Sequence, residues 1–169
     1  MGYKLIALDI DGTIRSQERP ISQRTRQAVD RVRNAGAIIT LATGRIFNSA
    51  TSSSADLDIK TPIATSQGAH IADPVTGDVL WHRPLTAEMT LAALGALEDL
   101  LASSSMEVVG YHKNQVYVNE LTDWASAYGQ RNNVMVNVVQ DLRKVADREL
   151  TRLVVVGDDD GIRELEANL

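Results

Sequence analysis

The sequence predicts an α/β protein with a parallel sheet in its N-terminal half and an α+β segment in its C-terminal half. Leu5–Leu8 and Ala37–Ala42 are apolar at consecutive positions, which is typical of strands that are buried on both faces. A helical pattern separates the two runs, and a strand–helix–strand unit of this spacing is right-handed with parallel strands. The pattern changes near Arg83, so we expect one domain over residues 1–83 and a second over residues 84–169.

In the N-terminal half, local signals mark each element. Ser22 is a good N-cap for a helix that ends near Ala35, and Gly36 fits the position that closes it. The apolar face of this helix is formed by Ala28, Val29, Val32 and Ala35. We further expect a short polar helix over Phe47–Ala55, a strand over Thr61–Ala64, and a hairpin of Ala69–Ala72 and Val79–His82 around a turn at Asp73–Asp78.

The C-terminal half is predicted to begin with a long helix that Thr86 caps. Leucines recur along this helix at Leu91, Leu94, Leu97 and Leu101. We expect helices over Ala87–Ala102, Asp123–Arg131 and Ile162–Leu169, and strands over Met106–Tyr111, Gln115–Asn119, Val134–Val139 and Leu153–Val156.

Two carboxylates follow the first strand. Asp9 and Asp11 are two positions apart, so the period of an extended chain places them on the same side of the backbone. Gly12 lets the chain turn and brings a bare N–H close to them. Two like charges at a strand end cost free energy unless a cation or a shared proton relieves them, and this edge is where open α/β sheets bind ligands. A plain strand end and turn is the alternative interpretation of the motif alone.

The second strand ends with Thr43, Gly44 and Arg45. Because parallel strands end at one edge of the sheet, these residues are expected beside Asp9 and Asp11. A hydroxyl and a bare N–H at the start of a helix are suited to holding phosphate oxygens. An ordinary strand-to-helix turn has the same composition, so the order of the two motifs is more specific than either one.

Two segments of the chain, in this order, resemble the first two motifs of the haloacid dehalogenase superfamily of phosphatases, in its Cof-type branch. They are Asp9-Ile10-Asp11-Gly12-Thr13 and Leu41-Ala42-Thr43-Gly44-Arg45. The resemblance implies that residues 1–83 are the N-terminal part of a Rossmann-like core, and that residues 84–169 are an inserted α+β cap. It implies Mg²⁺-dependent hydrolysis of a phosphate monoester, with a small phosphorylated metabolite as substrate. Many members of this branch carry Asn-Gly where this chain has Gln67-Gly68, so no role is carried over to Gln67.

The resemblance also implies roles for five residues. Asp9 would attack phosphorus and form an aspartyl phosphate. Asp11 would act as general acid and then as base, keeping a proton at neutral pH with the help of its carboxylate neighbour. Mg²⁺ would be held by Asp9 and by the backbone carbonyl of Asp11. Thr43 and the N–H groups of Gly12 and Gly44 would bind the transferring oxygens.

Two further motifs of the family do not occur in their expected context. One is a lysine that neutralises charge near the phosphate, and Lys144 lies instead among polar residues of the predicted cap. The other is Gly-Asp with a second acidic residue four or five positions later. Gly157-Asp158 is a candidate, but Ile162 and Arg163 occupy those positions. We interpret the acidic run that begins at Asp158 as a solvated turn leading into a helix.

These gaps predict that the chain is a truncated form of a longer enzyme or one part of a split one, and that the chain alone hydrolyses a phosphate monoester barely or not at all. In a longer enzyme, strands after the cap would pair with Leu5–Leu8. Without them this strand is a sheet edge, and exposing each apolar side chain there costs roughly 1.5–3 kcal/mol. We therefore expect weak Mg²⁺ binding, and self-association or pairing with a complementing C-terminal segment.

Two alternatives to a phosphatase stay open. One is a non-catalytic fragment or pseudo-phosphatase that binds metal or phosphate weakly. The other is a glycosyltransferase with a metal-binding D-x-D, which is disfavoured because only eight residues precede Asp9.

Composition argues against several other classes. The 17 basic and 22 acidic residues give a formal net charge of −5, so no basic face for nucleic acid is expected. Cysteine is absent, which excludes disulfides, thiolate chemistry and Cys-based zinc sites, and His70, His82 and His112 are too scattered to suggest a metal cluster. No stretch approaches the length of a membrane-spanning helix and the N-terminus is predicted to be a strand rather than a signal, so we expect a cytoplasmic protein without membrane contact.

Overall fold

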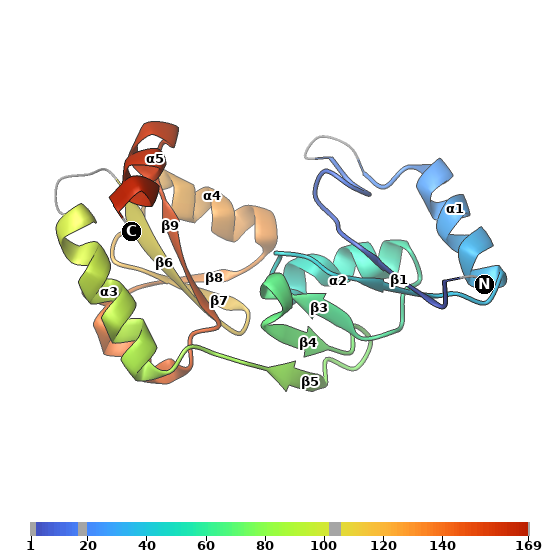
Figure 1. Cartoon of the computed structure of the whole chain (residues 1–169), viewed down its shortest axis with the longest axis horizontal. Coiled ribbons are helices and arrows are strands. Elements are labelled where there is room, and N and C mark those ends of the chain that lie inside the picture. Colours follow the sequence, from blue (N-terminus) through green and yellow to red (C-terminus); the bar gives the residue numbers. More distant parts are fainter. Residues whose placement is uncertain (1–2, 17–19, 102–105, 169) are drawn as a thin grey trace. The chain divides into compact units, whose positions relative to one another are not determined.

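The computed structural model describes residues 3–16, 20–101 and 106–168. The chain divides into two compact units, Met1–Arg83 and Pro84–Leu169 (Figure 1). Each unit is built around an apolar core of its own, and the two cores have no residue in common.

The first unit contains a parallel pair of strands and an antiparallel three-stranded sheet. β1 and β2 pair in parallel from Leu5–Ile38 to Leu8–Leu41, which confirms the predicted strand–helix–strand unit. A parallel bridge between Ala42 and Ala64 joins β2 to β3, and the second sheet has the order β3-β4-β5. The elements are β1 (Leu5–Leu8), α1 (Gln23–Asn34), β2 (Ile38–Leu41), α2 (Phe47–Asp56), β3 (Ile63–Thr65), η1 (Ser66–Gly68), β4 (His70–Ala72) and β5 (Val79–His82).

The ends of α1 form as its flanking residues predict. The Ser22 hydroxyl accepts a hydrogen bond from the N–H of Thr25 at 3.1 Å, which satisfies a donor of the first turn. Gly36 has a φ of +89° and donates to the carbonyl of Arg33 at 2.9 Å, so it ends the helix in a conformation that glycine adopts without strain. Val29 is buried, and Val32 packs against the same core.

The prediction that β1 and β2 are buried on both faces is wrong. Leu5 is 57% exposed and its cross-strand partner Ile38 is 53% exposed, whereas Ile39 and Leu41 are buried. Within the described residues β1 pairs with β2 alone, and α1 covers one face of the pair. A consecutive apolar run therefore predicted the strands correctly, but the burial of each face depends on neighbours that the run does not specify.

The second unit is a four-stranded sheet in the order β8-β7-β6-β9, with β7 and β8 parallel and the other pairs antiparallel. The 3₁₀ helix η2, of seven residues, was not predicted, and the expected helix end at Ala102 lies outside the described residues. The elements are α3 (Ala87–Leu101), β6 (Glu107–His112), β7 (Gln115–Val118), α4 (Asp123–Asn132), β8 (Met135–Val138), η2 (Leu142–Arg148), β9 (Arg152–Val156) and α5 (Asp159–Asn168).

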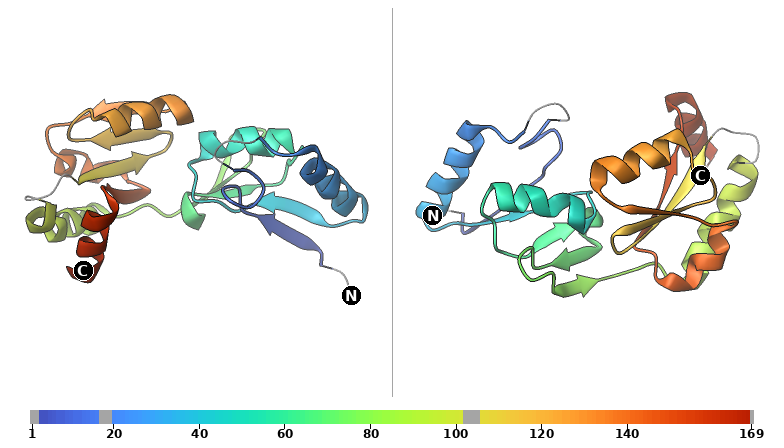
Figure 2. Two further views of the ribbon diagram at one scale, coloured as in Figure 1. Left: turned by 90° about the horizontal axis from the view of Figure 1, so that it is seen from above. Right: turned by 180° about the vertical axis from the view of Figure 1, so that it is seen from behind.

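Helices cover both faces of this sheet (Figure 2). On one face, Leu97 of α3 and Leu165 of α5 belong to the same core as Val108 of β6. On the other face, Tyr128 of α4 meets Tyr111 edge-to-face, with ring centroids 5.9 Å apart. None of the helices in the described ranges has the length and apolar character that crossing a membrane requires.

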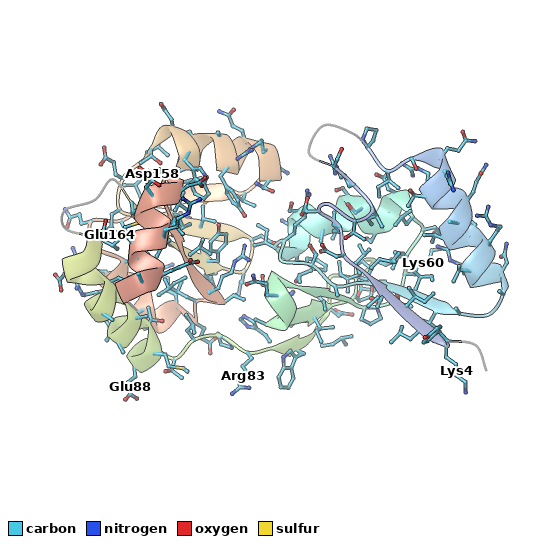
Figure 3. The ribbon with its side chains drawn as sticks, turned by 45° about the horizontal axis from the view of Figure 1, so that its top comes forward. Lys4, Lys60, Arg83, Glu88, Asp158 and Glu164 are labelled. Carbon is cyan, nitrogen blue, oxygen red and sulfur yellow. The ribbon has the colours of Figure 1, made fainter. Side chains whose placement is uncertain are left out.

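The acidic run lies at the start of α5, where Figure 3 labels Asp158. The Asp158 carboxylate accepts a hydrogen bond from the N–H of Gly161 at 2.8 Å, so it caps the helix. Asp159 and Asp160 occupy the first turn, where the helix dipole favours negative charge. The predicted turn is therefore shorter than expected, because two of its three residues are already helical.

Candidate active site

The loop after β1 holds Asp9 and Asp11 at the surface by burying the residue between them. Ile10 is completely buried, and its carbonyl accepts hydrogen bonds from the N–H groups of Ile14 at 3.1 Å and Arg15 at 3.0 Å. Asp9 and Asp11 are both exposed. This loop therefore presents two carboxylates to solvent while its backbone is anchored in the core.

The second motif begins where β2 ends, beside this loop. The N–H of Ala42 donates to the carbonyl of Leu8 at 2.9 Å, which continues the pairing of β1 and β2 up to the start of each motif. Thr43 is buried, and its N–H donates to the carbonyl of Ala64 at 3.0 Å. Its hydroxyl accepts from the N–H of Arg45 at 3.2 Å. The two motifs thus meet at one edge of the first sheet.

Arg45 joins the two motifs directly. Its Nε donates to Asp11 Oδ2 at 2.7 Å and its Nη2 to Asp11 Oδ1 at 2.6 Å, which is the bidentate geometry of a strong guanidinium–carboxylate pair. A further hydrogen bond of 3.4 Å joins Nη1 to the hydroxyl of Ser49 on α2. The sequence marked Arg45 as part of the second motif but gave it no role. A cation at the end of the strand beside two carboxylates was the signal that could have revealed the pair.

This pair lowers the pKa of Asp11. The hydrogen bonds from Arg45 are the largest cause, partial burial acts in the opposite direction, and the charges of Arg45 and Arg15 lower the pKa further. The expectation that Asp11 keeps a proton at neutral pH with the help of Asp9 is therefore wrong for this arrangement. The physical reason is that the hydrogen bonds and the charge of the paired guanidinium stabilise the ionised carboxylate more strongly than its partial burial destabilises it.

The predicted phosphate-binding N–H groups differ in their surroundings. The N–H of Gly12 donates to the carbonyl of Arg15 at 2.9 Å, so it is used within the loop, where Gly12 has a φ of +72°. Gly44 is exposed and lies beside Gln67, whose Cγ would be 3.6 Å from a Cβ placed on Gly44. A side chain at position 44 would therefore narrow the space between the second motif and Gln67.

A third loop, which includes Gln67, packs on the second motif. The N–H of Ser66 donates to the carbonyl of Arg45 at 2.7 Å, and the N–H of Gln67 to the carbonyl of Thr43 at 3.1 Å. Ser66 and Gln67 have φ values of 49° and 58°, a left-handed conformation that costs free energy in residues with a side chain. The sequence assigned no role to Gln67, yet the structure places it next to Thr43 and Gly44.

The oxygen atoms at this edge suit a weakly held Mg²⁺. Among the described residues, no hydrogen bond or ion pair engages the Asp9 carboxylate, and no three acidic or histidine side chains gather into a metal-binding group. Mg²⁺ commonly takes one or two carboxylates and keeps several waters. The Asp9 carboxylate and the Asp11 carbonyl therefore fit this ion, although Arg45 holds both oxygens of the Asp11 side chain.

Comparisons with known proteins are consistent with this geometry. Residues 6–169 match the model of a family described as haloacid dehalogenase-like hydrolase. The 5-amino-6-(5-phospho-D-ribitylamino)uracil phosphatase YitU of Bacillus subtilis is 25% identical over 166 residues, which are 98% of this chain and 60% of that protein. The HMP-PP phosphatase of Cronobacter sakazakii is 23% identical over 166 residues, which are 98% of this chain and 59% of that protein.

Solved structures show the same fold. The crystal structure of a haloacid dehalogenase-like hydrolase from Bacteroides thetaiotaomicron superposes with a TM-score of 0.77 at 20% identity, covering 99% of this chain and 63% of that one. The chain therefore spans less than two thirds of the length of each of these three proteins.

Proposed function

The chain belongs to the haloacid dehalogenase-like hydrolase family, and on this basis we propose that it is the nucleophile-bearing part of a Mg²⁺-dependent phosphatase that acts on a small phosphorylated metabolite. The observation that carries the proposal is the meeting of the Asp9–Asp11 loop with Thr43 and Arg45 at one sheet edge. Residues 1–83 would form the N-terminal part of the catalytic core, and residues 84–169 the cap.

Asp9 is the proposed nucleophile. Its carboxylate is exposed and free of partners among the described residues, so an oxygen can approach phosphorus without first breaking an ion pair. Attack forms the aspartyl phosphate as the bond from phosphorus to the leaving oxygen breaks, and water then attacks phosphorus and restores the carboxylate. Mg²⁺, held by the Asp9 carboxylate and the Asp11 carbonyl, would offset the repulsion between the carboxylate and the phosphate.

Asp11 is proposed to carry the proton, and Arg45 controls when it can do so. While the guanidinium holds both carboxylate oxygens, Asp11 stays ionised and gives no proton to a leaving oxygen. A phosphate group presents two oxygens in the geometry that a guanidinium binds, so it competes with Asp11 for Arg45. Once released, Asp11 can take a proton from solvent water, give it to the leaving oxygen as the bond to phosphorus breaks, and later take a proton from the attacking water.

Thr43 is proposed to donate a hydrogen bond to a phosphate oxygen. Its oxygen already accepts from the N–H of Arg45, which leaves the hydroxyl proton for a ligand. The relatives named above point to the class of substrate, because the name of YitU specifies a phosphorylated ribitylaminouracil and the other relative is named as a phosphatase of HMP-PP. A small phosphorylated metabolite is the class common to both.

Covalent trapping on Asp9 tests this proposal. The chain is incubated with an aryl phosphate and Mg²⁺, quenched in acid, and digested, and the peptide that contains Asp9 is examined by mass spectrometry. Because two motifs of the family are missing from their expected context, we expect phosphate on Asp9 in only a small fraction of the unaltered chain, and none in Asp9→Asn, which keeps the shape of the side chain. Asp147→Asn, at an exposed position in η2, is the matched control and should behave as the unaltered chain.

Two outcomes would contradict the proposal. Measurable release of the aryl alcohol at equal rates by Asp9→Asn and by the unaltered chain would remove Asp9 from the reaction. Binding of phosphate and Mg²⁺ without any phosphorylated Asp9 would instead favour the non-catalytic alternative.

A further inference from the structure

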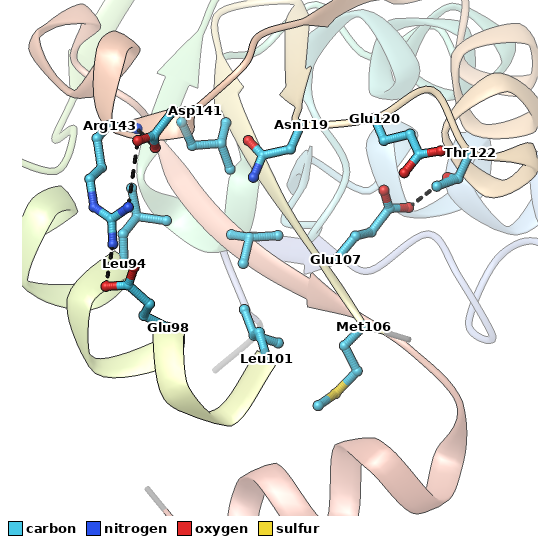
Figure 4. Close-up of a pocket in the computed structure, with 12 residues that line it drawn as sticks. Leu94, Glu98, Leu101, Met106, Glu107, Asn119, Glu120, Thr122, Asp141 and Arg143 are labelled. Atoms are coloured by element: carbon cyan, nitrogen blue, oxygen red, sulfur yellow. Dashed lines mark hydrogen bonds and ion pairs between the residues drawn. The ribbon is translucent and has the colours of Figure 1, made fainter. Parts of the chain in front are cut away.

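A pocket of about 560 Å³ lies in the second unit, at the end of the sheet where β6 and β7 part (Figure 4). The paired residues of these two strands end at Gly110–Tyr117, whereas β6 continues to Glu107 with β9 as its partner. The pocket opens between Val108 on β6 and Asn119, which follows β7. Its volume is that of a site for a small molecule rather than for a single ion.

The floor of the pocket is apolar. It is formed by side chains from α3, from β6 and the residue before it, and from η2, namely Leu94, Leu101, Met106, Val108 and Leu142. A hydrocarbon group that binds on such a floor is removed from water, which lowers the free energy. A ligand for this pocket therefore has an aliphatic or other apolar part.

One wall of the pocket balances its own charge. Arg143 donates to Glu98 at 2.8 Å and to Asp141 at 3.5 Å, and its backbone N–H donates to the same aspartate at 2.9 Å. Figure 4 shows Arg143 between these two carboxylates. The charges on this wall are therefore largely paired with one another, so the wall does not favour a charged ligand.

The opposite wall has carboxylates without a cation. Glu107 Oε1 accepts a hydrogen bond from the Thr122 hydroxyl at 2.8 Å, but Oε2 is buried and has no hydrogen-bond partner in the described part of the chain. Glu120 lies beside them (Figure 4), and no ion pair among the described residues reaches either glutamate. A carboxylate that is partly removed from water without a cation is unfavourable, and the exposed carboxylate of Glu120 beside it is open to a ligand, so this wall favours a ligand that carries a positive charge.

We propose that this pocket binds a small organic cation of the alkylammonium class, with its nitrogen at Glu107 and its hydrocarbon on the apolar floor. Four carboxylates and one guanidinium line the pocket, a net formal charge of −3, which disfavours an anion such as phosphate. No three side chains of the described residues form a metal-binding group, so a bare divalent ion is also disfavoured. The ammonium group offsets the unpaired negative charge of Glu107 and Glu120, and the carbon chain of the ligand covers the apolar floor.

Isothermal titration of the full chain tests the site with three probes. The first is n-butylammonium, which has both the charge and the hydrocarbon. Ammonium has the charge alone, and butanol has the hydrocarbon alone. We expect heat of binding that saturates with one butylammonium per chain, and at least about tenfold weaker binding of the other two probes, because each lacks one of the two interactions.

Variants then locate the binding. Glu107→Gln keeps the acceptor for Thr122 but removes the charge, and it should weaken butylammonium binding by about tenfold or more. Glu166→Gln, an exposed glutamate on α5 outside the pocket, is the matched control and should bind as the unaltered chain does. Asp9→Asn should also bind unchanged, which separates this pocket from the carboxylates of the proposed phosphatase site.

Circular dichroism first establishes that each variant is folded. If Glu107→Gln does not fold, Glu120→Gln decides, because Glu120 is exposed and belongs to the same wall. Absence of butylammonium binding to the unaltered chain would overturn the proposal. Equal binding by the pocket variant and by Glu166→Gln would overturn it too, since the amine would then bind surface carboxylates in general.

Discussion

Replacement of Arg45 by Gln is predicted to destabilise the first unit in a manner that depends on pH. The change removes both hydrogen bonds to Asp11, and the two side chains are 24% and 50% exposed, so water screens the pair. Partly exposed ion pairs contribute up to about 1 kcal/mol, and the bidentate geometry places this one near the upper end, at about 0.5–1 kcal/mol. Because the pKa of folded Asp11 lies below its ordinary value of 3.8, this stability is present above that value and is lost as the pH falls through the lowered pKa.

Urea unfolding at a series of pH values measures this effect. We expect the unaltered chain to be more stable than Arg45→Gln by the same amount from pH 7 to about pH 5, and the difference to vanish in acid below the pKa of Asp11. Arg24→Gln, an exposed position on α1, is the matched control and should show no such pH dependence. A double-mutant cycle with Asp11→Asn gives the coupling energy of the pair. A coupling energy of zero at pH 7, or one that persists after Asp11 is protonated, would refute the reasoning.

Three further predictions follow from the two units. Leu150→Ala should lower the free energy of unfolding by about 2–5 kcal/mol in urea titrations, because Leu150 is completely buried, whereas the 56% exposed Leu121 should tolerate alanine within about 0.5 kcal/mol. Thr43→Ala should slow phosphorylation of Asp9 without abolishing it, by the loss of one hydrogen bond to a charged oxygen worth about 1.5–3 kcal/mol; an unchanged single-turnover rate would exclude Thr43 from phosphate binding. Mg²⁺ should bind the chain only weakly, and calorimetry that shows micromolar or tighter affinity would contradict a site with one carboxylate and one carbonyl.

The elements of the fold could be predicted wherever the signal is local. Apolar runs identified β1 and β2, and the Ser22 hydroxyl and Gly36 fixed the ends of α1, because caps and strand patterns act over a few residues. Burial of β1 could not be predicted in the same way, since it depends on which elements cover each face. The η2 segment has helical spacing only at Leu142, Val145 and Ala146, and a pattern of three apolar residues within seven is too short to predict a helix.

The candidate site was only partly predictable. The order of the motifs placed Asp9 and Asp11 beside Thr43, because parallel strands end at one edge. The pairing of Arg45 with Asp11 joins residues 34 positions apart and depends on the side-chain direction of Arg45 in the loop before α2, which no residue pattern specifies. The pocket in the second unit depends on where the pairing of β6 and β7 stops, and this is a property of strand twist and side-chain packing rather than of residue spacing.

The left-handed backbone of Ser66 and Gln67 limits which sequence changes at this loop are informative. Among non-glycine residues, asparagine and aspartate adopt this conformation most readily, whereas valine and isoleucine strongly disfavour it. At position 67 the positive φ therefore limits which residues the backbone tolerates, whatever the chemistry of their side chains. Alanine scanning would confuse the two effects, because a loss of activity could come from a shifted loop. Gln67→Asn is the more informative substitution, because asparagine keeps an amide group and also tolerates the positive φ at this position.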